Sequence, residues 1–120
     1  MLSDAMSNTA TEQSNHSWEQ ASSMALKRVD ALIARLPEDL RREASELECE
    51  FLRRCDDPNA QDTMGGYSRS AHRIRLYLDA IDDYCRLNGL DYCSQVETTF
   101  LHELGHRLGV EEDGLEKRGL

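Results

Sequence analysis

The stretch from Gln95 to Glu112, which reads QVETTFLHELGHRLGVEE, constrains this chain more than any other part of the sequence. It contains His102, Glu103 and His106 in the pattern H-E-x-x-H. On an α-helix, side chains four residues apart share one face, so both imidazoles can approach one metal ion from the same side. Glu103 points about 100° further round the helix, where it can meet a water at that metal. The spacing predicts a helix with two histidine ligands and a carboxylate general base, which is the pattern of zinc hydrolases.

The predicted helix has two unlike sides. Ser94 and Glu97 have the spacing of a capping box, which predicts that the helix starts here. His102 and His106 lie on one side of the helical wheel, whereas a histidine buried for structural reasons would lie among apolar residues. The apolar residues gather on the opposite side and are Val96, Phe100, Leu101, Leu104 and Leu108. This separation favours an apolar back that packs on the core and a polar front that carries the chemistry.

A third metal ligand is expected just beyond the helix. Gly109 follows His106 at a spacing that extends the motif to H-E-x-x-H-x-x-G-x-x-E and ends it at Glu112. Glycine can adopt a left-handed conformation and end a helix sharply, after which the chain can turn back towards the metal. Catalytic zinc generally has three protein ligands and a water, so Glu112 is the predicted third ligand. Glu111 and Asp113 are alternatives, and a solvated acidic run with no ligand also fits these residues.

Length and composition limit what kind of protein this can be. A chain of 120 residues has room for one domain with one modest core. Its 14 Lys and Arg against 23 Asp and Glu give a net charge of −9, which argues against nucleic-acid binding. No apolar run is long enough to span a bilayer, and the N-terminus lacks the features of a secretory signal. We therefore expect a soluble, cytoplasmic protein with no membrane partner and with its four cysteines reduced.

The N-terminal part predicts a tail followed by an amphipathic helix. Residues 1–17 are rich in Ser, Thr, Asn and Gln and are expected to be a disordered tail. Ser17 and Gln20 have the spacing of a capping box, and apolar residues then recur at helical intervals. The helix should end near Leu36, because Pro37 disfavours helical geometry in the residue before it. A short second helix can start at Pro37.

The middle of the chain predicts two strands, a loop and a helix. Leu47–Phe51 alternates apolar residues with glutamates, which favours a strand over a helix that continues to Arg54. Two clusters of Gly, Pro and Asn predict a loop over Asp56–Ser70. The clearest strand lies in His72–Ile81, and Ile81–Leu90 is expected to be a short helix that ends at Asn-Gly.

The segment ETTFLHELGHRLGVEEDGLEKRGL resembles the C-terminal part of the minimal zincin-like metallopeptidases. These are small bacterial proteins whose active helix reads roughly T-x-x-H-E-[IL]-G-H-x-[FL]-G-[LV] and is followed by acidic residues and a short closing helix. The resemblance extends from Trp18 to Leu120 and is most specific over Thr98–Gly109. It implies one domain over residues 18–120 with an α+β, zincin-like fold. That fold would comprise an N-terminal amphipathic helix, a small mixed β-sheet, the H-E-x-x-H helix and a short C-terminal helix.

The resemblance also implies roles for the site residues. His102 and His106 would bind Zn²⁺, Glu103 would be the catalytic base, and Glu112 stands where the family usually has its acidic ligand, often Asp. In zincins, an extended substrate commonly lies antiparallel to an edge strand beside the active helix, and Leu47–Phe51 or the RIRLYL segment could be that strand. No oxyanion donor is singled out among four candidates, which are Tyr67, Tyr77, Arg75 and His72.

Three functional hypotheses follow from the sequence. The first is a zinc metallopeptidase that hydrolyses peptide or protein substrates with Glu103 as general base. The second is a metal-binding but non-proteolytic regulatory or interaction module on the same core. It is supported by the small size of the chain and by the lack of a downstream Met-containing turn such as the larger metzincins have. The third is a helical domain with two exposed histidines and no metal.

Overall fold

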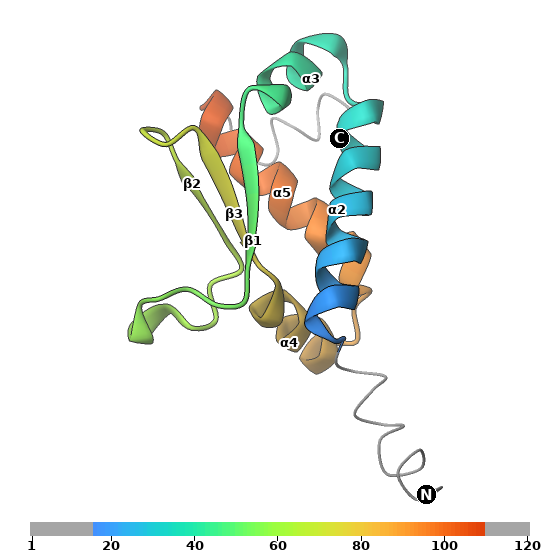
Figure 1. Ribbon diagram of the computed structural model, residues 1–120, viewed down its shortest axis with the longest axis vertical. Coiled ribbons are helices and arrows are strands. Elements are labelled where there is room, and N and C mark those ends of the chain that lie inside the picture. The colour runs from blue at the N-terminus through green and yellow to red at the C-terminus, as the bar shows by residue number, and fades with distance from the viewer. Residues whose placement is uncertain (1–15, 110–120) are drawn as a thin grey trace, which may run out of the picture.

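The computed structural model describes residues 16–109 and shows two layers, with helices packed on one face of a small sheet (Figure 1). Along the chain the elements are α2 (Trp18–Arg35), α3 (Glu38–Ser45), β1 (Glu48–Leu52), the 3-10 turn η1 (Pro58–Ala60), β2 (Gly65–Ser68), β3 (Arg73–Tyr77), α4 (Leu78–Asn88) and α5 (Tyr92–Leu108). This arrangement confirms the predicted α+β fold with a small mixed sheet. Residues 1–15 of the predicted tail, the predicted C-terminal helix and the three candidate acidic ligands lie outside the described residues.

The sheet has the strand order β1-β3-β2, so β3 is its central strand. β1 runs parallel to β3, and β2 runs antiparallel to it. On β3, Ile74 and Leu76 are fully buried and point towards the helices. Arg75 points to the other face, where its Nε donates to Glu50 Oε1 on β1 at 3.1 Å. The sheet therefore has one apolar face covered by helices and one charged face, as the alternation in the sequence predicts.

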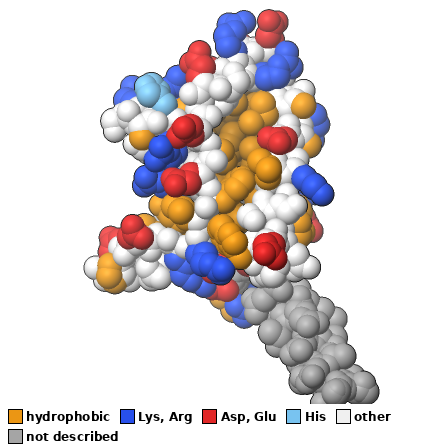
Figure 2. Space-filling model, in the orientation of Figure 1, with side chains coloured by type: hydrophobic (Ala, Val, Ile, Leu, Met, Phe, Trp, Pro, Cys, Tyr) orange, Lys and Arg blue, Asp and Glu red, His pale blue; other side chains and the backbone are white. Residues whose placement is uncertain are grey.

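The first two helices follow their sequence signals closely. Ser17 caps α2, and its capping box with Gln20 is complete in both directions. The helix ends at Arg35, and Leu36 is extended before Pro37. The buried face of α2 packs against α5, and the Tyr92 hydroxyl of α5 donates to the carbonyl of Ala21 at 2.9 Å. In Figure 2, apolar side chains gather between β1 and α2, with charged side chains along the margins.

Three of the predicted boundaries are wrong. Gly65–Ser68 lies inside the predicted loop but forms β2, because pairing with β3 overrides the weak strand propensity of its two glycines. Helix α4 begins at Leu78 rather than near Ile81, since burial of Leu78 at the end of β3 makes a turn directly into the helix favourable. Helix α5 begins at Tyr92 with Asp91 as its N-cap, and Asp91 accepts a hydrogen bond from the backbone of the predicted cap, Ser94.

Helix α5 lies at the centre of the molecule, between the sheet and helices α2 and α4. Val96, Phe100 and Leu104 are at most 1% exposed and form its apolar back, as predicted. All four cysteines are free. None of the helices in the described part has the length and apolarity needed to cross a membrane.

Candidate metal centre

The last two turns of α5 bring His102, Glu103 and His106 together. The Nε2 atoms of the two histidines are 3.2 Å apart, and their rings stand perpendicular with centroids separated by 4.7 Å. Potential ligand atoms of all three residues lie within 4.8 Å of one another. Both imidazoles are exposed, whereas Glu103 is only 6% exposed. The group thus has two accessible nitrogen ligands beside one buried carboxylate.

The two histidines fit zinc in chemistry and in spacing. Zinc binds histidine nitrogens at about 2.0–2.1 Å in tetrahedral sites, which separates two such nitrogens by about 3.3 Å. The 3.2 Å between the Nε2 atoms of His102 and His106 already approaches that value. Neutral imidazoles at this distance also suit a hydrogen bond between the two rings when one Nε2 carries a proton. The pair is therefore arranged to hold one metal ion with little rearrangement.

Burial sets the chemical character of Glu103. Strand β2 passes directly above it, and a Cβ placed on Gly65 would lie 3.3 Å from Glu103 Cγ. Burial raises the pKa of Glu103, and the neighbouring His106 and His102 oppose that rise. A carboxylate with a raised pKa takes up a proton more readily, which suits a general base.

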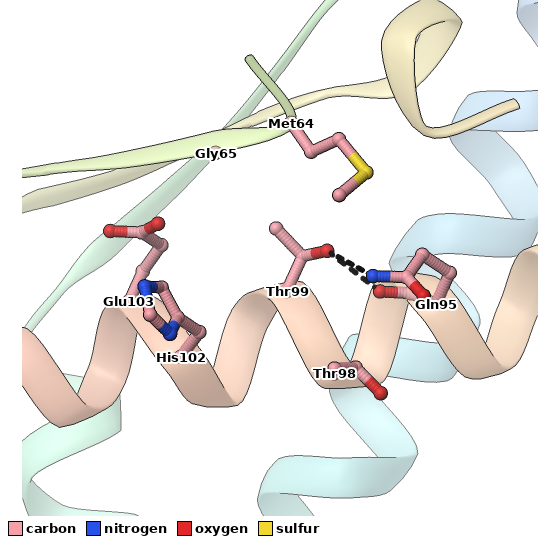
Figure 3. A pocket seen from close by; sticks show the side chains of 7 residues that line it. All are labelled: Met64, Gly65, Gln95, Thr98, Thr99, His102 and Glu103. Atoms are coloured by element: carbon pink, nitrogen blue, oxygen red, sulfur yellow. Dashed lines mark hydrogen bonds between the residues drawn. The ribbon is translucent and has the colours of Figure 1, made fainter. Parts of the chain in front are cut away.

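A cavity of about 310 Å³ opens beside Glu103 and extends along α5 towards its N-terminus. Its lining residues are Met64, Gly65, Gln95, Thr98, Thr99, His102 and Glu103. Figure 3 shows Met64 reaching over the helix from the start of β2, with Thr99 and Gln95 beneath it. Since His102 and Glu103 are part of the lining, a molecule in this cavity would lie next to the candidate metal site.

Gly109 ends α5 as the sequence predicts. It has φ 71° and ψ 27°, the left-handed conformation, and its N–H lies against the carbonyls of Gly105 and His106. The C-cap of the helix therefore lies three residues after the second histidine. The predicted third ligand, Glu112, and its alternatives follow this turn outside the described residues.

Arg107 attaches the end of α5 that carries the two histidines to the rest of the fold. Its Nε donates to Glu43 of α3 at 3.1 Å, and Nη2 donates to Glu46 at 3.2 Å. Nη1 lies 3.2 Å from Nδ1 of His72, and the side chain also hydrogen-bonds Tyr67 of β2. Because α3, β2 and the turn before β3 all contact this one guanidinium, it restrains the helical turn that carries His106.

The residues predicted as possible oxyanion donors, and the RIRLYL segment predicted as a possible substrate-binding strand, are not placed for those roles. Arg75 points to the outer face of the sheet, and Tyr77 is buried there with Cys55 as a hydrogen-bond partner. Tyr67 and His72 are partners of Arg107. None of the four candidate oxyanion donors is among the residues that line the cavity. The RIRLYL segment cannot be a free edge strand, because β3 is paired on both sides. The edge strand beside the site is β2, within the predicted loop.

The sequence interpretation missed the residues of the cavity wall. Gln95, Thr99 and Glu103 repeat every four residues, so helical periodicity was a signal that could have grouped them. Met64 and Gly65 had no such signal, since they reach the site only through the pairing of β2 with β3.

Comparison with known proteins agrees with the geometry. The family model of zincin-like metallopeptidases matches residues 26–120. The chain therefore belongs to the zincin-like metallopeptidase family. Among curated proteins, none matches the chain. Membership of this family implies a metal, usually zinc, and the His102, Glu103 and His106 group could bind it.

Proposed function

We propose that this protein is a zinc-dependent peptidase in which His102 and His106 bind the metal and Glu103 is the general base. The observation that carries the proposal is the convergence of the two Nε2 atoms, 3.2 Å apart, beside a glutamate that is 6% exposed. We further propose Glu112 as the third ligand, because α5 ends in a left-handed Gly109 and the acidic residues follow this helix end closely in the sequence.

The buried carboxylate of Glu103 accounts for the proton transfers. When bound, zinc supplies Lewis-acid chemistry: it polarises a carbonyl group and lowers the pKa of a coordinated water. Glu103 takes a proton from the attacking water on one carboxylate oxygen and then delivers it to the nitrogen of the departing amine. Because Glu103 is buried beneath β2, its carboxylate is less hydrated than that of a surface acid. The raised pKa that results favours proton uptake.

Strand β2 is the best candidate for aligning an extended peptide. It is an edge strand, and its residue Gly65 contacts α5 at Thr99 and Glu103. The outer side of β2 is not paired with another described strand, so its backbone can hydrogen-bond an extended segment. A peptide held there would pass the end of α5 that carries the two histidines.

Metal analysis tests the binding half of the proposal. Purified protein should contain about one zinc per chain, as measured by elemental mass spectrometry. His102→Ala and His106→Ala should each lose it. His16→Asn is the matched control, because it removes another histidine, which packs beside Tyr92 at the opposite end of α5 from the site. Retention of zinc by both alanine variants would contradict the proposed ligands.

The catalytic half needs a variant that keeps the metal. Glu103→Gln should still bind zinc but lose at least about 100-fold in peptide hydrolysis, the size of a general-base contribution. Cleavage that survives in Glu103→Gln would remove this residue from the mechanism. Zinc binding with no cleavage of any peptide by the wild-type protein would instead favour a metal-binding module without proteolytic activity.

A further inference from the structure

The cavity beside Glu103 lies between α5 and the start of β2. Its walls come from two stripes of α5, Gln95-Thr99-Glu103 and Thr98-His102, and its roof from Met64 and Gly65 (Figure 3). Gln95 stands eight residues before Glu103, or about 12 Å along the helix axis. The reacting groups thus lie at one end of the cavity and Gln95 at the other.

The size of the cavity suits one side chain. Sites for whole small molecules range from about 300 to 1,000 Å³, and this cavity of about 310 Å³ is at the lower limit. A peptide that passes His102 and Glu103 can therefore place one side chain here while the rest of its length remains outside.

The polar atoms of the wall are largely bonded to one another. Thr99 Oγ1 donates to the Gln95 carbonyl at 2.8 Å and accepts from Gln95 Nε2 at 3.2 Å. Thr98 Oγ1 donates to the Ser94 carbonyl at 3.1 Å. With these hydroxyls already engaged, the walls offer mainly methyl groups and the Met64 thioether to an occupant.

Charge is confined to one end of the cavity. Among its described lining residues, the ionisable ones are His102 and Glu103, and both belong to the candidate metal centre. A charged side chain that reached Gln95 would lose hydration without gaining an oppositely charged partner. An uncharged side chain loses little and buries apolar surface against Met64.

We infer that this cavity is the specificity pocket of the enzyme, that it accepts an uncharged side chain of the substrate, and that Gln95 at its far end excludes charged ones. The inference rests on the proposed peptidase function, since it assigns the substrate class of that same site. Gln95 is the specificity-determining residue, and an acid in its place converts the pocket to one for basic side chains.

Two metal-chelating probes test this without requiring hydrolysis. Both are hydroxamates that bind zinc; one carries an isobutyl branch and the other an aminobutyl branch. Their binding to the zinc-loaded full-length protein is measured by calorimetry. The wild-type protein should bind the isobutyl probe at least about tenfold more tightly. Gln95→Glu should lose this preference or reverse it, and Gln95→Leu should keep it. An acid is compatible with the fold here, because position 95 is close to the N-terminus of α5.

The control is Asn59→Asp, which adds the same charge at an exposed position in η1. It should leave the preference as in the wild-type protein. Equal binding of the two probes by the wild-type protein overturns the inference, and so does an unchanged preference in Gln95→Glu. If neither probe binds zinc-loaded protein, the inference falls together with the proposed metal site. If the probes behave as expected but no peptide is cleaved, the pocket stands and the catalytic proposal alone fails.

Discussion

Replacing Gly65 with alanine should loosen the contact between β2 and α5. A Cβ at this position would lie 2.7 Å from Thr99 Cγ2, and also 3.3 Å from both the Arg75 carbonyl oxygen and Glu103 Cγ. Carbon atoms in van der Waals contact are separated by about 3.5–4.0 Å, so the strand and helix must move apart by roughly 1 Å. Rotation of Thr99 does not relieve the clash cheaply, because its side chain is 6% exposed and its hydroxyl is bonded to the Gln95 carbonyl.

The magnitude follows from two opposing effects. Overpacking of this kind costs about 1–3 kcal/mol. Alanine also restricts the unfolded chain, which offsets about 0.4–1 kcal/mol where the folded backbone is compatible, as it is here because φ of Gly65 lies outside the left-handed range. We expect Gly65→Ala to lower the free energy of unfolding by about 1–2 kcal/mol. Urea denaturation, followed by circular dichroism, measures it.

Gly66→Ala is the matched control on the same strand. A Cβ on Gly66 would meet nothing within 4 Å, so only the effect on the unfolded chain remains. This variant should be as stable as the wild-type protein or more stable, by up to about 1 kcal/mol. If the two variants unfold at the same urea concentration, β2 does not pack on α5 as closely as described, and the account of Glu103 burial fails with it.

Three further predictions concern the end of α5 and the core. Gly109→Ala should lower the free energy of unfolding by about 1–2 kcal/mol in urea denaturation, since φ is +71° there and a Cβ is strained in that conformation. Arg107→Met should weaken zinc binding about tenfold in competition with a chelator, the effect expected of a residue that restrains a ligand. Arg28→Met, which removes an ion pair between α2 and Glu97 of α5, should leave zinc affinity unchanged, and equal effects of the two variants would contradict a positioning role for Arg107. Burial, and secondarily the charge of Asp30, raises the pKa of Cys49 to about 12, so iodoacetamide at pH 8 should label this thiol only after unfolding, as mass spectrometry of labelled peptides will show.

The sequence alone determined the features that depend on one helix or one strand. The grouping of His102, Glu103 and His106 follows from 3.6 residues per turn, whatever surrounds the helix. The left-handed end at Gly109 follows from the conformational freedom of glycine. Likewise, the alternation in β1 and β3 predicted their two faces, because successive side chains of a strand point to opposite sides.

Only the tertiary structure decided what surrounds that helix. Strand β2 has almost no strand propensity of its own, and pairing with β3 places Gly65 over Glu103 and Met64 over the cavity. The partners of Arg107 at the end of α3 and just after it, Glu43 and Glu46, likewise come from more than 60 positions away in the chain. Local sequence patterns carry no information on such contacts, because these contacts form and stabilise the protein only when the sheet and helices pack together. The candidate site residues could therefore be identified from the sequence, whereas the burial of Glu103 and the pocket beside it depend on the tertiary structure.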